Sequence, residues 1–209
     1  MEFDKIISDV DAVLRAKDAK REKAISYSRE IIRRSGSAIL AIHKRDEKVA
    51  KENLEAARTA LNASLEICKE QPEYYFTGPL PQAFQEFAEA SIVLALVKRR
   101  KVYSPQELKV PVESYITGLA DAAGEMRRYA LDSLRRDNFE EAERALGVMD
   151  EVYTALKSLD YPRAVVPNLK RKVDVIRRLV EETRGDVTLA HQGRLIRSRI
   201  DSALKRGRK

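Results

Sequence analysis

The sequence predicts an all-α protein. Eight glycines and seven prolines are few for 209 residues, and long stretches of Ala, Leu, Glu, Lys and Arg favour helix throughout. In most of these stretches apolar residues recur every three or four positions, which is the spacing of an amphipathic helix. Because 44% of the residues are hydrophobic, the chain can form a substantial core. No repeat or linker stands out, so we expect one domain, residues 1–209, of about seven helices.

Two helices are expected before residue 46. Residues 3–16 predict an amphipathic helix that docks on the bundle, with an apolar face of Phe3, Ile6, Ile7, Val10, Val13 and Leu14. Residues 18–45 predict a longer helix, with an inward stripe of Ile25, Ser28, Ile32, Ser35, Ile39 and Ile42. Acids thin out between Glu30 and Asp46, which leaves an unbalanced basic stripe of Arg29, Arg33, Arg34, His43, Lys44 and Arg45. We expect this stripe to contact phosphates, with His43 facing solvent or a phosphate.

The remaining helices follow from start and stop signals. Residues 47–70 and about 80–101 predict two helices separated by a turn rich in proline and glycine. Ser104, Pro105 and Glu107 have the order of a capping box and begin a short helical turn. Pro111 opens the next helix, which should end near Asp137, and Asn138 caps one that runs to about residue 159. A last helix, residues 169–185, should end at Gly185.

The tail beyond residue 186 is basic. Residues 191–209 contain seven Arg and Lys against Asp201, with an apolar stripe of Leu195, Ile196, Ile200 and Leu204. This pattern predicts a separate amphipathic tail, about residues 187–209. The tail could contact RNA, pack on a neighbouring subunit or remain in solvent, and the sequence does not decide between these alternatives.

Two pairs of acidic residues form the candidate site. On a helix, Glu86 with Glu89 and Asp121 with Glu125 each share one face. The first pair adjoins a segment that is apolar almost all round, so those carboxylates should be partly buried. Glycines at 118 and 124 suggest a close helix contact beside the second pair. Four converging carboxylates would suit magnesium or manganese, although such spacing also occurs on solvated helix faces, and Arg128 can pair with Glu125.

Charge and cysteine content limit the partners and the location. Forty basic against 33 acidic residues give a net charge of +7, which favours a polyanionic partner. The lone Cys68 excludes an internal disulfide framework and is best explained as a small core residue in a reducing cytosol. No stretch of about 18 apolar residues occurs, so we expect neither export nor membrane insertion and place the protein in the cytoplasm.

Four segments resemble the translin family, and specifically its Trax branch: 27–44 (YSREIIRRSGSAILAIHK), 84–90 (FQEFAEA), 112–139 and 169–186. The third is the most specific, because it contains Tyr115, Gly118, Asp121 and Glu125 at the spacing Tyr-x-x-Gly-x-x-Asp-x-x-x-Glu. The resemblance implies an all-α subunit of a hollow oligomer, an octamer in the family, that binds single-stranded RNA or DNA. It also implies a magnesium-dependent endoribonuclease site, with Glu86, Glu89, Asp121 and Glu125 as metal ligands and catalytic residues.

Three functions are therefore carried forward. The first is an endoribonuclease in which the four carboxylates hold Mg²⁺ and the metal activates water. The second is a non-catalytic shell that binds single strands, with Tyr74, Tyr75 and Phe76 as candidates for base stacking. The third is an all-α nucleotide pyrophosphohydrolase, which the extended basic surface disfavours. A diiron bundle is disfavoured too, because neither histidine completes a Glu-x-x-His pattern.

Overall fold

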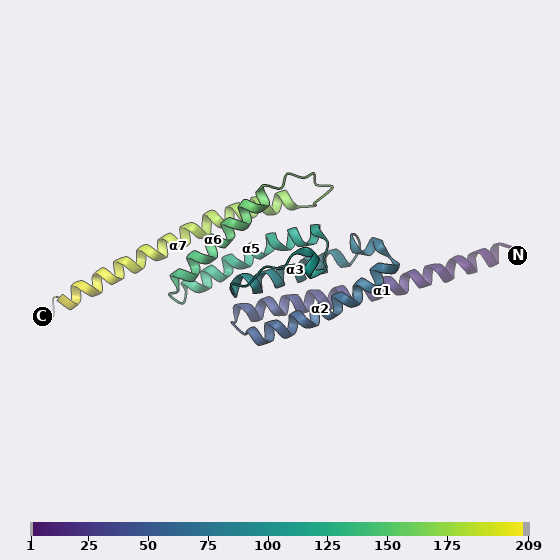
Figure 1. The fold of residues 1–209 in the computed structure, drawn as a ribbon, viewed down its shortest axis with the longest axis horizontal. Coiled ribbons are helices and arrows are strands. Elements are labelled where there is room, and N and C mark those ends of the chain that lie inside the picture. The colour runs from purple at the N-terminus through teal and green to yellow at the C-terminus, as the bar shows by residue number, and fades with distance from the viewer. Residues whose placement is uncertain (1, 207–209) are drawn as a thin grey trace. The chain divides into compact units, whose positions relative to one another are not determined.

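The computed structural model describes residues 2–206, and all regular structure in that range is helical (Figure 1). The α-helices are α1 (Glu2–His43), α2 (Glu47–Glu70), α3 (Leu80–Val97), α4 (Pro105–Leu108), α5 (Val112–Leu134), α6 (Phe139–Lys157) and α7 (Leu169–Arg206). One 3₁₀ turn, η1 (Pro72–Tyr75), lies between α2 and α3. The all-α prediction is confirmed.

The residues group into two compact units, Met1–Gly118 and Leu119–Lys209, with the division inside α5. The sequence analysis predicts one domain, and that assignment stays a prediction. Each unit is described by itself below.

The core of the first unit is formed by α1, α2 and α3, which contact one another. Phe84, Phe87 and Ile31 are fully buried there. The Ser28 hydroxyl donates a hydrogen bond of 2.6 Å to the carbonyl of Pro79, which fixes the start of α3 against α1. Most of the predicted inward stripe of α1 is buried, so the helical spacing correctly predicts which face packs.

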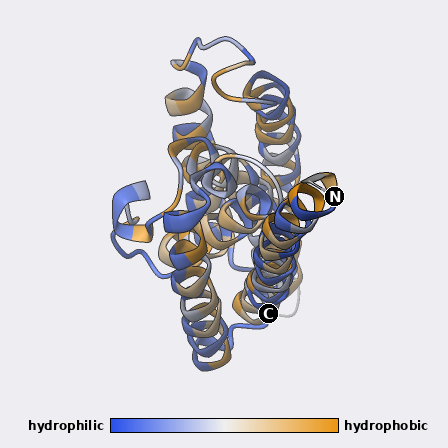
Figure 2. Ribbon diagram, turned by 90° about the vertical axis from the view of Figure 1, so that its right-hand side faces the viewer, coloured by the Kyte–Doolittle hydropathy of each residue, from blue (hydrophilic) through white to orange (hydrophobic). Residues whose placement is uncertain are grey.

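The N-terminal part of α1 differs from the prediction. Residues 2–43 form one continuous helix, and residues 3–19 are exposed instead of docking on the bundle. Phe3 is 77% exposed and Ile7 is 64% exposed, and Figure 2 shows apolar residues at this end of the chain. No proline or glycine interrupts residues 15–20, so nothing ends the helix between the two predicted segments. We call residues 2–19 the N-terminal arm.

The C-terminal part of α7 also differs from the prediction. The helix continues through Gly185 to Arg206, because a glycine stops a helix only where it adopts a left-handed conformation. Its buried residues end at Val187, and almost all the later described ones are exposed. We call residues 188–206 the C-terminal arm.

Several local signals are confirmed. Ser104 and Glu107 form the predicted capping box at α4, and the Asn138 side chain accepts a hydrogen bond from the backbone N–H of Glu141 at the start of α6. Cys68 is buried, and burial raises the pKa of its thiol to about 11. It is therefore the inert core residue that the sequence predicts. Within residues 2–206, no helix is both long enough and apolar enough to cross a lipid bilayer.

Glu47 at the start of α2 holds three cations. Its carboxylate lies 2.8 Å from the Lys51 ammonium, 2.7 Å from the Lys98 ammonium and 2.8 Å from the Arg100 guanidinium. The hydrogen bond from Lys51, followed by those from Lys98 and Arg100, lowers the pKa of Glu47 from 4.5 to about 2. This network links α2 to the end of α3.

We expect Glu47→Gln to remove one acid-sensitive contribution to stability. Because the folded-state pKa is lowered, the ionised carboxylate stabilises the fold above about pH 4.5 and loses that effect as the pH falls towards 2. The variant should be less stable than the wild type at neutral pH, and the difference should shrink below pH 4.5. Denaturant unfolding between pH 2 and 7 measures this, and a pH-independent difference would contradict it.

Candidate functional site

The first predicted acidic pair lies on α3. Glu89 is buried, with 8% of its surface exposed, whereas Glu86 is half-buried and accepts a 2.7 Å hydrogen bond from the Gln82 amide. Burial of Glu89 is as predicted, because residues 87–93 are buried on nearly every side of the helix. A buried carboxylate needs a hydrogen-bond donor or a cation beside it to offset its desolvation.

A close contact between α5 and α3 occurs beside this pair. A Cβ atom at Gly118 would lie 2.7 Å from the Gln85 carbonyl oxygen and 3.1 Å from the Glu89 backbone nitrogen. The Ser114 hydroxyl, one turn earlier on α5, donates a 3.0 Å hydrogen bond to the Pro81 carbonyl. Only glycine permits this approach, so the predicted role of Gly118 is confirmed. Gly124 has open space around it, so the prediction of a close helix contact at that residue is wrong.

The second acidic pair lies in the second unit, on the part of α5 that follows Gly118. The Lys172 ammonium on α7 donates a short hydrogen bond to the Asp121 carboxylate, and both side chains are largely buried. Glu125 is half-buried and pairs with Arg128 at 3.9 Å, as its spacing predicts. The lysine is 51 residues from its partner in sequence, so no local pattern could identify it.

Arg127 connects the same stretch of α5 to α7. Its guanidinium donates a 2.6 Å hydrogen bond to the Thr183 hydroxyl and lies 3.3 Å from the Asp186 carboxylate. These contacts hold the helix that carries Asp121 and Glu125 against α7. Each unit thus contributes two of the four predicted carboxylates, and the part of the chain described here contains no group of three or more His, Cys, Asp or Glu side chains placed to hold a metal ion.

The predicted basic stripe separates into three parts. Arg29 and Arg33 line a groove between α1 and α2, whose α2 wall is formed by the small residues Ala56, Thr59, Ala60 and Ala63. Lys44 and Arg45 are exposed in the turn after α1 and lie outside this groove. His43 is only 6% exposed. Its predicted solvent-facing position is wrong, because residue 43 continues the inward stripe through Ile39 and Ile42.

Glu30 partly neutralises the groove. Arg33 lies 2.5 Å and Arg34 2.8 Å from its carboxylate. The hydrogen bond from Arg33, followed by that from Arg34, lowers the pKa of Glu30. Arg29 has no ion pair among residues 2–206, so its charge is available to an anion.

The aromatic residues proposed for base stacking mostly pack together. Tyr75 lies with its ring centroid 5.6 Å from that of Phe84 and 5.0 Å from that of Phe76. Phe76 is 64% exposed, so it alone of the three presents a large open surface.

Comparisons with known proteins agree on one family. The Translin family model matches residues 19–183. The uncharacterized protein MJ0175 of Methanocaldococcus jannaschii is 36% identical over 191 residues, which cover 88% of this chain and 82% of the relative.

Solved structures give the same result. AfC3PO, solved alone and as a complex with duplex RNA, is 30% identical, with a TM-score of 0.82 over 90% of this chain and 98% of that chain. The apo form of NeC3PO, 22% identical, has the same fold, with a TM-score of 0.80 over 88% of this chain and 96% of its own.

Proposed function

Because the chain belongs to the Translin family, we propose that it binds RNA and cleaves it as a magnesium-dependent endoribonuclease. The observation that carries the proposal is the set of four carboxylates at the spacing of the catalytic branch. Gly118, the glycine of the same sequence pattern, supports it, because it lets the start of α5 approach the Glu89 backbone. The solved complex of AfC3PO with duplex RNA supports RNA as the partner.

The four carboxylates are the proposed ligands of a magnesium or manganese ion. Carboxylate oxygens are the ligands these hard cations prefer, and Glu86, Glu89, Asp121 and Glu125 supply them. The Lys172 ammonium pairs with the Asp121 carboxylate, so a metal ion at Asp121 would have to displace it. When bound there, the metal would lower the pKa of a coordinated water and offset charge on the scissile phosphate.

The chain's own residues would bind and orient the substrate. Lys172 would position the Asp121 carboxylate and, where released from it, would donate to a phosphate oxygen. The Gln82 amide orients the Glu86 carboxylate. Whichever of the four carboxylates is not a metal ligand would accept a proton from the attacking water.

We place the strand in the groove between α1 and α2. Arg29 and Arg33 line it, and the small side chains on α2 leave room for a backbone. Contacts to the phosphate backbone do not distinguish one base from another, so binding should have low sequence specificity. Single-stranded RNA is the proposed substrate, with single-stranded DNA as a second ligand. Because AfC3PO was solved with duplex RNA, binding of duplex RNA should be measured beside binding of single strands.

Neutralising the groove should reduce the salt dependence of binding. In Arg29→Gln/Arg33→Gln protein, the slope of log affinity against log salt should become shallower by about 0.7 for each lost phosphate contact with a single strand. Fluorescence anisotropy with labelled RNA at several salt concentrations measures the slope. Arg163→Gln, in an exposed loop, is the matched control and should keep the wild-type slope. An unchanged slope in the double variant would move the interface elsewhere.

A non-catalytic RNA-binding protein is the second candidate. The ion pair between Lys172 and Asp121 favours it, because this pair satisfies the Asp121 carboxylate without a metal. Incubation of labelled RNA with and without Mg²⁺ separates the two candidates: cleavage supports the first, and binding without cleavage supports the second.

We also propose that the protein acts as a homo-oligomer, an octamer by resemblance to the family. The N-terminal arm exposes a large apolar face through Phe3, Ile6, Ile7 and Val10, which water disfavours. By sequence, residues 2–14 contain four acids against Lys5, whereas residues 194–206 contain five bases against Asp201. Opposite charge on two apolar arms supports head-to-tail pairing between copies, which gives a closed ring when the rotation between copies closes.

The solution mass should be several times 23.8 kDa. Light scattering at micromolar concentration measures it, and Ile6→Asp/Val10→Asp protein should have a lower mass, because charge on the apolar face opposes its burial. Ser8→Asp, on the opposite face of the arm, is the control. A monomeric wild type would refute the oligomer.

A further inference from the structure

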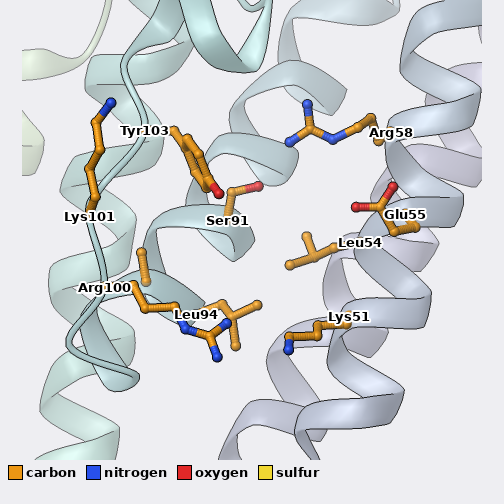
Figure 3. Close-up of a pocket in the computed structure, with 10 residues that line it drawn as sticks. Lys51, Leu54, Glu55, Arg58, Ser91, Leu94, Arg100, Lys101 and Tyr103 are labelled. Carbon is orange, nitrogen blue, oxygen red and sulfur yellow. The ribbon is translucent and has the colours of Figure 1, made fainter.

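A separate cavity, lined by cationic, hydroxyl and apolar side chains, lies within the first unit, apart from the α1–α2 groove and from the carboxylates discussed above. It measures about 270 Å³ and is bounded by α2, α3 and the segment that follows α3. Figure 3 shows its two ends: Arg58, Ser91 and Tyr103 face one another at one end, Lys51 and Arg100 lie at the other, and Leu54 and Leu94 lie between them. Its volume is close to the lower limit for small-molecule sites, about 300 Å³.

Arg58 is the cation in this cavity that no carboxylate engages. Lys51 and Arg100 are bound to Glu47, and Lys101 is bound to Glu107 at 2.6 Å. The Arg58 guanidinium instead lies 5.4 Å from the centroid of the buried Phe87 ring and has no ion pair in the range 2–206. A ring contact orients the planar guanidinium while its N–H groups stay available to an anion.

Ser91 supplies a second, independent observation. Its side chain is buried, with 8% of the residue exposed, and its hydroxyl has no hydrogen-bond partner within the described chain. Figure 3 shows this hydroxyl directed into the cavity between Tyr103 and Arg58. Because no protein group among the described residues uses this hydroxyl, it can donate to an anion beside the unpaired guanidinium.

The wider charge balance favours an anion. Five cationic side chains surround or adjoin the cavity, namely Lys51, Arg58, Lys98, Arg100 and Lys101, whereas the nearby carboxylates are those of Glu47, Glu55 and Glu107. Glu55 lies beside Arg58 on α2 in Figure 3, so an anion should contact the part of the Arg58 guanidinium that faces Ser91 and Tyr103. Leu54 and Leu94 provide apolar walls against which a flat ring can pack.

We propose that this cavity binds a nucleoside monophosphate, either free or as the phosphorylated terminal nucleotide of a strand. The phosphate accepts hydrogen bonds from the Arg58 guanidinium and from the Ser91 and Tyr103 hydroxyls. The nucleotide base packs against the side chains of Leu54 and Leu94. This site goes beyond the proposed ribonuclease activity and does not depend on the carboxylates or on Mg²⁺.

Calorimetric titration of the full-length protein with AMP, without Mg²⁺, tests the proposal. Wild type should bind AMP more tightly than adenosine or inorganic phosphate, because each of these lacks half of the contacts. Arg58→Met, which keeps an apolar stem over Phe87, should weaken AMP binding at least about tenfold, and Ser91→Ala should weaken it less. Arg177→Met, exposed on α7, is the matched control and should bind as wild type does.

Three results would overturn the proposal: no AMP binding by wild type, equal binding of AMP and adenosine, or wild-type affinity in both Arg58→Met and Ser91→Ala. Competition by oligonucleotides identifies the source of the ligand. If a 5′-phosphorylated strand displaces AMP better than its 5′-hydroxyl form, the ligand is a strand end; if neither does, it is a free nucleotide. Because cleavage is not measured, a failure of the ribonuclease proposal would leave these results unaffected.

Discussion

RNA cleavage should fall at least about 100-fold when Glu125 is changed to Gln. The substitution keeps the shape of the side chain but removes the charge that a hard cation requires of its ligand. Its ion pair with Arg128 is long, at 3.9 Å, so loss of that pair should cost little stability. RNA binding and oligomer mass should therefore persist while cleavage is lost. Cleavage of labelled single-stranded RNA, scored with and without Mg²⁺, is the measurement.

Two controls make that experiment decisive. Glu151→Gln, on the exposed surface of α6, removes an equal charge outside the site and should cleave as wild type does. Added Mg²⁺ should raise the melting temperature of wild type more than that of Glu125→Gln, because a ligand that binds only the folded state stabilises it. Undiminished cleavage in both Glu125→Gln and Asp121→Asn would exclude these carboxylates and leave the non-catalytic RNA-binding protein as the better proposal.

Gly118→Ala should destabilise the protein by about 1–3 kcal/mol, the usual cost of overpacking. The new Cβ would lie 2.7 Å from the Gln85 carbonyl oxygen, and a backbone atom cannot move away as a flexible side chain can. This clash outweighs the helix propensity that alanine gains over glycine, about 1 kcal/mol. Cleavage should fall as well, since α5 must shift from the backbone of Glu89.

Gly124→Ala is the matched comparison, six residues later on the same helix. No atom lies within 4 Å of the Cβ position there, so this variant should gain about 1 kcal/mol of stability. Thermal and denaturant unfolding of the two variants should give changes of opposite sign. Equal effects would mean that the close contact between α5 and α3 does not constrain residue 118.

The features that sequence predicts correctly depend on residues close together in the chain. Ser104 with Glu107 and Asn138 with Glu141 are signals within one helical turn, and each cap forms as expected. The cost of a mid-helix glycine also predicts the contact at Gly118, but the same signal at Gly124 predicts a contact that does not form. The candidate carboxylates follow from spacing together with the family resemblance, and their role stays a prediction.

The features that sequence misses depend on distant residues or on weak stop signals. Lys172 reaches Asp121 from another helix, and the Arg58 cavity combines side chains from α2, α3 and the segment after α3. The basic neighbourhood of His43 hides its place on the inward stripe. Gly185 does not end α7, because glycine is tolerated inside a helix at a cost of about 1 kcal/mol.

The continuation of α7 past Val187 has a consequence for local unfolding. Beyond that residue the described side chains bury almost nothing, and Gly193 adds to the cost already imposed by Gly185. Short helices without tertiary packing are marginal in water, so in a single copy the backbone hydrogen bonds after Val187 should open at almost no free-energy cost. Amide hydrogens before it should exchange only when the second unit opens. Slow exchange along the C-terminal arm would then report directly that another surface covers it.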